Sequence, residues 1–272
     1  MLSDMPSSQQ GAWDPAPPTP PKHDVRGLCG TARPIVDRVA DVYARHFGRR
    51  LVGLVAKGSA VNGDYIAGCS DIDLHLYLDD AAFDARGIVP FAVQVAVHRE
   101  LQKIETWPFA YVQGIALRCE PHPGWVGPIP GMYHVVAGRN PTPEATPEDL
   151  RASAKAALDA LDPPPAYLRE ALLDSGAGRV GRLVRLLVTA DYWPTVRHLL
   201  IARGREPLAA WQMRKAEAVA ALGDGSEAGR HARAFFDALE AFYPAAVDVD
   251  RGLAMLEHGV AFLAAAKREA AR

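Results

Sequence analysis

The stretch LVGLVAKGSAVNGDYIAGCSDIDLHLYL, residues 51–78, decides the expected fold and carries the candidate chemistry. Its first six residues are a short apolar run that predicts a buried strand. Gly58 and Ser59 follow this run, and eleven residues separate them from Asp71. Asp73 comes two positions after Asp71, with Ile72 between them, so two carboxylates lie at the start of a second apolar run.

The segment 71–78 is predicted to be a strand with two different faces. Side chains alternate between the faces of a sheet, so every second residue shares a face. The apolar positions are expected to pack in the core: Ile72, Leu74, Leu76 and Leu78. Both acids then share the opposite face with His75 and Tyr77.

The pairing of a small-residue turn with two acids predicts a site for metal and phosphate. Two carboxylates held close together repel each other and raise at least one pKa unless a cation lies between them. Hard oxygen ligands suit Mg²⁺, which also keeps places for water and substrate phosphates. Gly58 lets the backbone approach a ligand closely, since it has no Cβ, and Ser59 adds a hydroxyl. The alternative is an ordinary solvated Asp-x-Asp at a strand end.

These residues resemble the signature of the nucleotidyltransferase superfamily that includes DNA polymerase beta. That signature is a hydrophobic residue, Gly, Gly or Ser, a variable gap, and then acid-hydrophobic-acid. The matching residues are Gly58, Ser59, Ser70, Asp71 and Asp73, and Gly63 lies where small-molecule members often carry a glycine. The layout of the whole chain is most similar to that of bacterial aminoglycoside adenylyltransferases of the streptomycin/spectinomycin type. The resemblance implies an α+β nucleotidyltransferase fold, a small mixed sheet flanked by helices, followed by an all-α bundle.

The resemblance also implies a reaction. A nucleoside monophosphate, AMP from ATP, would pass to a hydroxyl of a small molecule such as an aminoglycoside-like antibiotic, with two Mg²⁺ ions held by Asp71 and Asp73. Gly58, Ser59 and Ser70 would bind the nucleotide, and Lys57 and Lys215 are further candidates near it. Two alternatives stay open: a protein or RNA end as acceptor, or a catalytically silent nucleotide-binding module.

The position of the catalytic base departs from the family pattern. Members commonly carry a further acid on the next strand, and the counterpart in this sequence is Gln113. A glutamine cannot accept a proton at neutral pH. Glu120, at the far end of the strand, is therefore the candidate catalytic residue, with Glu105 as the other possibility. Otherwise the hydroxyl loses its proton to solvent, or activity is reduced or lost.

Composition limits the class of protein. The net charge is −2 and 49% of the residues are hydrophobic, which allows a real core and argues against binding long nucleic acids through bulk charge. Three cysteines without Cys-x-x-Cys spacing indicate free thiols in a reducing cytosol. No apolar run is long enough to cross a membrane and no signal layout is present, so a cytoplasmic protein is expected. Oligomeric state is not predicted.

The remaining sequence divides into three expected regions. Residues 1–28 are Pro-rich and expected to be disordered, residues 29–145 form the nucleotidyltransferase domain, and residues 146–272 form a helical substrate-binding domain. In the second region we expect a helix from Thr31 as N-cap to Phe47, a helix at 91–104, a strand at 109–118 and an edge strand at 132–137. The third region is expected to hold helices at 147–161, 167–174, 180–193, 195–202, 208–222, 230–242 and 251–269. In its last helix the predicted buried face is Leu253, Leu256, Val260 and Leu263.

Other features of the helical region are weaker signals. Gly176 to Gly181 spells GxGxxG, but a dinucleotide site needs a strand directly before it, and 167–173 has a helical pattern; a turn between helices is expected. Arg182, Arg185 and Trp211 are candidates for closing over the nucleotide. Four acids are available to meet a cationic acceptor: Asp159, Glu170, Asp174 and Asp191.

Overall fold

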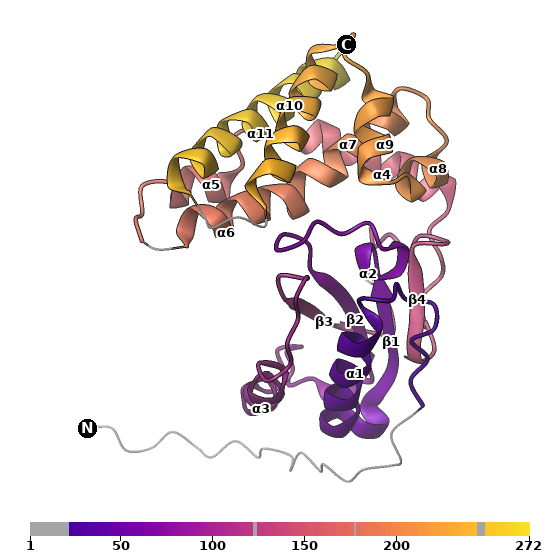
Figure 1. Ribbon diagram of the computed structural model, residues 1–272. Helices are drawn as coiled ribbons and strands as arrows, with labels where there is room; N and C mark the ends of the chain where they lie inside the picture. Colours follow the sequence, from indigo (N-terminus) through magenta and orange to yellow (C-terminus); the bar gives the residue numbers. More distant parts are fainter. Residues whose placement is uncertain (1–21, 122–123, 177, 244–247) are drawn as a thin grey trace, which may run out of the picture.

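The computed structural model describes residues 22–121, 124–176, 178–243 and 248–272 (Figure 1). It is a mixed α/β protein, with a four-stranded mixed sheet in the first half of the chain and helices in the second. The predicted mixed sheet and the C-terminal helices are thus confirmed at this level. None of the helices in the described ranges is both long and apolar enough to cross a membrane.

The sheet has the strand order β3-β2-β1-β4. Its strands are β1 (Leu51–Lys57), β2 (Ile72–Leu78), β3 (Val112–Arg118) and β4 (Tyr133–Gly138). The central strand β1 is antiparallel to both β2 and β4, whereas β2 and β3 are parallel. Parallel neighbours need a crossover connection, which here contains the helix α3 (Phe91–Leu101).

One face of the sheet is covered by α1 (Arg33–Phe47) and α3. The four apolar residues predicted to face the core, Ile72, Leu74, Leu76 and Leu78, are buried in the same hydrophobic cluster as α1 residues, which confirms the expected alternation along β2. Three short helices flank the first two strands: η1 (Gly48–Arg50) precedes β1, α2 (Ser59–Asn62) lies between β1 and β2, and η2 (Asp80–Ala82) follows β2.

Two expectations for the first half of the chain need correction. Residues 22–28 do not continue a disordered segment, since the Asp24 amide donates to the Val136 carbonyl at 2.7 Å and Leu28 is buried; residues 1–21 lie outside the described ranges. Thr31 is not the N-cap of α1, because that position is held by Ala32. The Thr31 hydroxyl lies 3.3 Å from the Tyr65 hydroxyl instead.

The helical part begins at Pro147, after a capping box in which the Thr146 hydroxyl accepts from the Asp149 amide. Its helices are α4 (Pro147–Ala160), α5 (Ala166–Ala171), α6 (Arg179–Leu186), α7 (Trp193–Ala202), α8 (Pro207–Gln212), α9 (Lys215–Leu222), α10 (Glu227–Phe242) and α11 (Val249–Ala270). A π-helical segment, Leu187–Tyr192, joins α6 to α7 without a break. Helix α5, not a strand, precedes the GxGxxG segment, as expected; Ala177 within it is not described.

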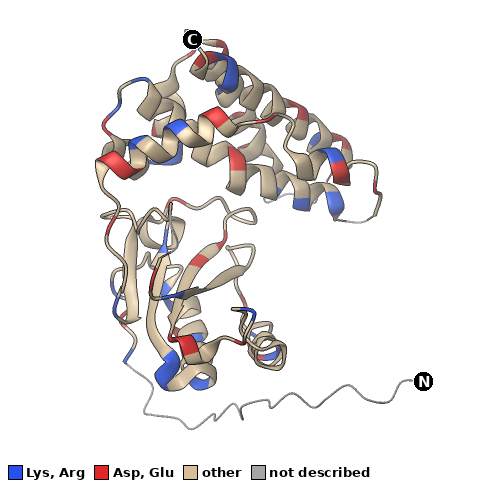
Figure 2. Ribbon diagram, turned by 180° about the vertical axis from the view of Figure 1, so that it is seen from behind, with Lys and Arg blue, Asp and Glu red and all other residues tan. Residues whose placement is uncertain are grey.

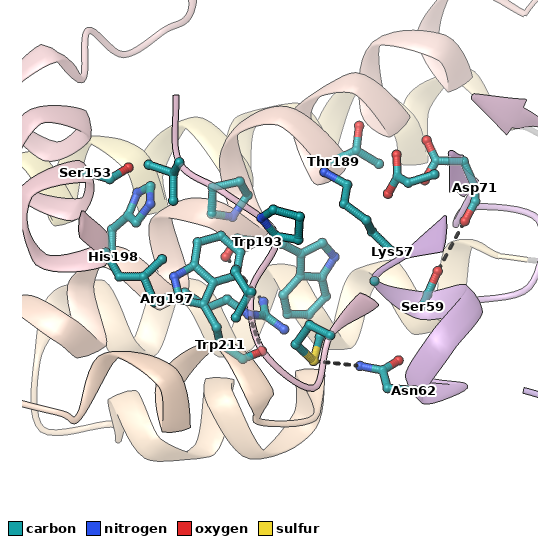
Figure 3. A pocket seen from close by; sticks show the side chains of 18 of the residues that line it. Lys57, Ser59, Asn62, Asp71, Ser153, Thr189, Trp193, Arg197, His198 and Trp211 are labelled. Atoms are coloured by element: carbon teal, nitrogen blue, oxygen red, sulfur yellow. Dashed lines mark hydrogen bonds between the residues drawn. The ribbon is translucent and has the colours of Figure 1, made fainter. Parts of the chain in front are cut away.

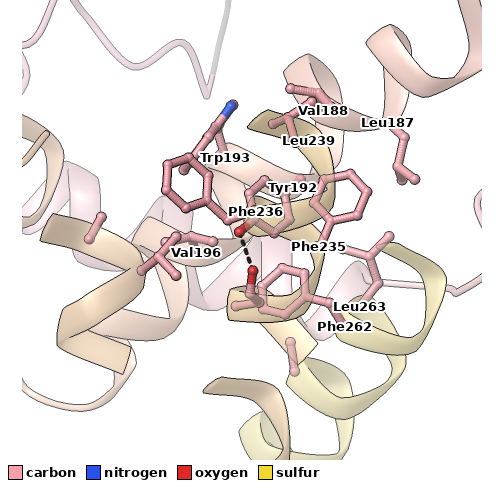
Figure 4. Close-up of a cluster of buried hydrophobic side chains, with 14 of the residues drawn as sticks. Leu187, Val188, Tyr192, Trp193, Val196, Phe235, Phe236, Leu239, Phe262 and Leu263 are labelled. Atoms are coloured by element: carbon pink, nitrogen blue, oxygen red, sulfur yellow. Dashed lines mark hydrogen bonds between the residues drawn. The ribbon is translucent and has the colours of Figure 1, made fainter. Parts of the chain in front are cut away.

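The helical part has its own hydrophobic core around aromatic rings (Figure 4). Tyr192 is fully buried and contacts Trp193, Phe235 and Phe262 with ring centroids 4.4–5.1 Å apart. Its hydroxyl donates to the Ala232 carbonyl at 2.7 Å, so the one polar atom of this side chain is satisfied. Trp193, at the start of α7, is therefore fixed in place by its packing against core residues.

The predicted buried face of α11 is partly wrong. Leu253 is 39% exposed. The buried residues of α11 are Gly252, Met255, Leu256, Gly259, Phe262, Leu263, Ala265 and Ala266. Two of them are glycines. A Cβ at Gly259 would lie 2.5 Å from a methyl of Leu187, so glycine is what allows the helices to approach closely on this side.

Helices α8 and α9 replace the single helix that was expected at 208–222. The chain is extended at Met213 and Arg214 between them. Arg197 donates to the carbonyls of Trp211 and Met213, and the Asp64 carboxylate accepts the amide of Lys215 at 2.6 Å. Tertiary partners thus satisfy backbone groups that a continuous helix would otherwise have paired.

Candidate active site

A cavity of about 670 Å³ lies between the sheet part and the helical part (Figure 3). Both aspartates line it together with the Gly58–Ser59 turn, and so do the other nucleotide candidates Ser70, Lys57 and Lys215. The wall on the helical side comes from α4, the π-helical segment, α7, α8 and α9. The residues that sequence reasoning grouped at positions 57–73 therefore share one cavity with a lysine more than 140 positions away.

Asp71 and Asp73 lie close enough for their charges to interact. Asp71 is buried, just before β2, and Asp73 is half-buried on its second residue. Burial and the neighbouring Asp71 carboxylate raise the pKa of Asp73 to about 6, against the opposing effect of Lys57 and Lys215. Burial and the adjacent Asp71 carboxylate also raise the pKa of Tyr111 to about 12. This excess of negative charge on hard oxygen atoms is what a divalent cation would neutralise.

The Gly58–Ser59 turn packs directly on the two acids. The Ser59 hydroxyl donates to the Asp71 carbonyl at 3.2 Å. Gly58 has φ +60° and ψ −130°, a conformation that residues with a Cβ rarely adopt. A Cβ built at Gly58 would lie 3.7 Å from Oδ2 of Asp73. The turn thus lies against the backbone of Asp71 and beside the carboxylate of Asp73.

Strand register places four polar side chains in one row across the sheet. Lys57 of β1 is opposite Asp73 of β2, Tyr133 of β4 is opposite Lys57, and Gln113 of β3 is opposite Asp73. Directly opposite residues of neighbouring strands point to the same face. Burial lowers the pKa of Lys57 and the Asp73 charge opposes that shift. Gln113 therefore occupies the position next to Asp73 where the family resemblance implies a third acid.

His75 is on the same face as Asp73, two positions along β2. It is buried, lines the cavity and lies with its ring centroid 5.5 Å from that of Trp125. Burial, together with the Lys57 charge, lowers its pKa to about 3. The imidazole is therefore neutral at physiological pH.

Glu120 and Glu105 do not join the aspartates. Glu120 is exposed beyond the end of β3, where Arg118 is opposite Leu78. Leu78 is separated from Asp73 by roughly 16 Å of strand. Glu105 is exposed in the α3–β3 connection and accepts the Trp107 amide at 3.0 Å. Neither lines the cavity, so the structure gives no support for the predicted base at Glu120.

Lys215 connects the two parts of the chain. It begins α9, and its ammonium donates to the backbone carbonyl of Asp64 while lying 3.7 Å from the Asp64 carboxylate. The same ammonium lies 5.5 Å from the Trp193 ring centroid. Burial lowers the pKa of Lys215, and Asp64 opposes that shift. The side chain is thus a structural contact between α9 and the segment after α2 as well as part of the cavity wall.

Asp64→Asn should destabilise the protein by about 3 kcal/mol, because it leaves the buried Lys215 ammonium without its counter-charge. Urea unfolding at pH 7 measures this loss. Asp159→Asn is the matched control, since Asp159 and its partner Lys155 are exposed on α4 and such pairs contribute about 0.5 kcal/mol or less. Equal losses in the two variants would show that the Asp64–Lys215 pair has no special role.

Sequence reasoning missed the aromatic and basic cluster on α7. Arg197 is only 5% exposed and lies over the rings of Trp193 and Trp211, 5.9 and 5.5 Å from their centroids. Burial lowers the pKa of Arg197 to about 10, and the Asp64 charge opposes this. The spacing of Trp193 and Arg197 by four residues on a helix was the available signal. Trp211 had been singled out, and it lines the cavity.

The other basic candidates are placed differently. The Arg185 guanidinium lies 5.8 Å from the ring centroid of Tyr111, the residue beside Asp71, whereas Arg182 is exposed. Neither is among the residues that line the cavity. The π-helical segment that follows α6 does line the cavity, through Val188 and Thr189.

His198 gives the fold a dependence on pH. Burial and the adjacent Arg197 charge lower its pKa to about 4, from 6.5 in the unfolded chain. The unfolded state therefore takes up a proton below pH 6.5 that the folded state refuses until about pH 4, so stability falls with falling pH across this window. The wild type should therefore lose free energy of unfolding between pH 7 and pH 4, and we expect His198→Asn to make this loss about 3 kcal/mol smaller. Urea unfolding from pH 7 to pH 4 tests this, and parallel curves for both proteins would contradict it.

The donor set is compatible with Mg²⁺ but small. Among the described residues no group of three or more His, Cys, Asp or Glu side chains could hold a metal ion. The fit therefore depends on the two carboxylates; burial and the neighbouring Asp71 charge together raise the pKa of Asp73. Mg²⁺ commonly uses one or two carboxylates plus water and substrate phosphates, so the residues present fit a metal that arrives with a nucleotide.

The fold and the site together define a mixed α/β protein with a cavity between a sheet and a helical part, and two interacting carboxylates in its wall. No family model and no curated protein matches this chain.

Proposed function

We propose that this protein is a Mg²⁺-dependent nucleotidyltransferase of the DNA polymerase beta type, which moves AMP from ATP to a hydroxyl of a small molecule. The observation that carries the proposal is the contact between the Gly58–Ser59 turn and the two aspartates at the wall of one cavity. A volume of about 670 Å³ is within the range of sites for small molecules. The nucleotidyltransferase fold is part of the same proposal.

In this proposal each side chain has a defined task. Asp71 and Asp73 hold the metal, which when bound neutralises the triphosphate and stabilises the attacking and leaving oxygens. Ser59 and the amides of its turn bind the β- and γ-phosphates, with Ser70 supporting the adjacent loop by accepting the Ile66 amide at 2.9 Å. Lys57 adds positive charge beside Asp73.

The proton of the acceptor hydroxyl needs a destination. Apart from Asp71 and Asp73, no described residue of the cavity wall is a carboxylate. His75, with a pKa of about 3, is too weak a base to hold the proton. In this proposal the proton therefore leaves to water, and the residues of the site contribute positioning and charge instead of general-base catalysis.

A second candidate, a catalytically silent nucleotide-binding module, is favoured by one observation. Gln113 stands beside Asp73, where the resemblance implies an acid. Titration calorimetry with ATP and Mg²⁺, followed by a pyrophosphate-release assay over hydroxyl compounds, separates the two candidates. Binding with release supports the transferase, binding without release under every acceptor supports the silent module, and no Mg²⁺-dependent binding contradicts both.

A further inference from the structure

The half of the cavity away from the aspartates has a distinct chemistry. In Figure 3, Asp71 and Ser59 lie at one end, Ser153 and His198 at the other, and Trp193 between them. The distal half, as we call the wall formed by Ser153, Trp193, Arg197, His198 and Trp211, comes entirely from the helical part. Its composition bears on the acceptor, because the nucleotide candidates lie at the other end.

The distal half contains no carboxylate among the described residues. The four acids that could have met a cationic acceptor are placed elsewhere. Asp159 pairs with Lys155, Asp174 pairs with Arg179, and Asp191 accepts the Tyr167 hydroxyl at 2.5 Å. Glu170 is exposed on α5, and none of the four lines the cavity. Residues of both charges are spread along the helices (Figure 2).

The only charged group of the distal half is a buried cation. Arg197 donates to the carbonyls of Trp193, Trp211 and Met213 at 3.3–3.4 Å, and no carboxylate among the described residues lies within ion-pair distance of it. Asp64, which lies outside the cavity wall, offsets part of this charge, but among the described residues of the distal half the charge has no carboxylate partner. A cationic compound placed here would meet a like charge in a partly desolvated site, which is strongly unfavourable.

The rest of the distal half favours flat, uncharged groups. Trp193 is fixed by the core, with ring centroids 4.7 Å from Tyr192 and 5.7 Å from Phe236. Trp211 contacts His198 edge-on at 5.8 Å. His198 is neutral at pH 7, since its pKa is about 4. Rigid tryptophan rings bind planar apolar groups well because little side-chain entropy is lost.

We propose that the acceptor is an uncharged hydroxyl compound with an aromatic or similarly flat apolar portion, which packs in the distal half against Trp193 and Trp211. A polycationic acceptor such as an aminoglycoside is disfavoured. This inference rests on the proposed function in naming the compound an acceptor, but the charge preference of the distal half is measurable without any transfer. The proposal also requires that the nucleotide and the acceptor occupy the cavity at the same time.

Two compounds that share a ring and its hydroxyls but differ in charge test the proposal. p-Nitrophenylserinol carries an amine that is cationic at pH 7, and its N-acetyl derivative has the same ring and hydroxyls without the charge. With the full chain, Mg²⁺ and saturating α,β-methylene ATP, titration calorimetry should show the N-acetyl compound binding at least tenfold more tightly than the amine, and streptomycin more weakly than the N-acetyl compound.

The pair Ser153→Asp and Ser153→Asn supplies the control, since the two variants have the same shape and differ in charge. The preference for the N-acetyl compound should be at least tenfold smaller in Ser153→Asp than in Ser153→Asn, because only Ser153→Asp adds a carboxylate to the distal half. Equal affinity for the amine and the N-acetyl compound in the wild type would overturn the proposal. So would tighter binding of streptomycin, or no binding of the N-acetyl compound at millimolar concentration.

Two further outcomes keep the inference separate from the proposed function. If α,β-methylene ATP displaces the N-acetyl compound, the distal half holds the nucleobase and the acceptor proposal is wrong. If the nucleotide does not bind in the presence of Mg²⁺, the proposed function is wrong. The same titrations without nucleotide then test the charge preference of the distal half by itself. Tighter binding of the N-acetyl compound than of the amine supports that preference, and equal or weaker binding contradicts it.

Discussion

Asp73→Asn should abolish nucleotide transfer while leaving the fold intact. The substitution removes one of two carboxylates that share the end of β2 and replaces it with an uncharged group of the same shape. Stabilisation by a bound metal amounts to several kcal/mol, and each 1.36 kcal/mol corresponds to a factor of ten in rate. We therefore expect turnover to fall by at least about 10³-fold.

The thermal stability of Asp73→Asn should not fall together with its activity. In the absence of Mg²⁺, removing one of two like charges relieves repulsion with Asp71, so the melting temperature should be unchanged or higher. Adding Mg²⁺ and ATP should then raise the melting temperature of the wild type by mass action but not that of the variant. Pyrophosphate release and thermal unfolding, each with and without Mg²⁺, measure the two effects.

Asp80→Asn is the matched control for this experiment. Asp80 is an exposed carboxylate in η2, beyond the far end of β2, where it pairs with Arg118. The chemical change is identical, but the position is remote from the cavity. Turnover should stay at the wild-type level in Asp80→Asn, and wild-type turnover in Asp73→Asn would refute the assignment of the site.

Gly58→Ala should lower transfer about 10²-fold through a change of backbone position. At φ +60° and ψ −130° a Cβ makes the conformation strained, at a cost of about 1–3 kcal/mol. The chain can relieve that strain by moving the turn away from Asp71 and Asp73, and displacements near 1 Å in a catalytic site can cost about 10²-fold in rate. Steady-state kinetics and urea unfolding report on the two consequences.

Gly204→Ala separates strain from function. Gly204 also has a positive φ, +86°, and its added Cβ would meet nothing within 4 Å. It follows α7 and lies outside the cavity wall. This variant should lose a similar amount of stability and keep its activity. If Gly58→Ala keeps full activity as well, the turn does not position the phosphates.

Local patterns explain what could be predicted in the first half of the chain. The alternation of Ile72, Leu74 and Leu76 with polar residues is a property of neighbouring positions, and it correctly assigned the face of β2 that joins the hydrophobic core with α1. The contact of the Gly58–Ser59 turn with Asp71 could be expected as well, because the turn directly follows β1 and Asp71 directly precedes β2, and these two strands are neighbours in the sheet.

Residues far apart in the sequence decided the rest of the site. The Lys215 amide and Asp64 are 151 positions apart, and their hydrogen bond helps to divide the expected helix at 208–222 into two. Helical propensity alone could not show this break, since no Pro or Gly marks it. Likewise, the exposure of Leu253 follows from the two glycines of α11 that let neighbouring helices approach on another face.

The sequence by itself thus determined the strands, the Gly58–Ser59 turn and the paired acids, because side-chain alternation and turn chemistry act over a few residues. Only the tertiary structure decided which groups surround them. It separated Glu120 from Asp73 along the sheet, set Gln113 beside that aspartate, and built the opposite wall from Trp193, Arg197 and Trp211. The physical reason is that packing of distant helices, and the burial that comes with it, fixes the charge and shape of a cavity between two parts of a chain.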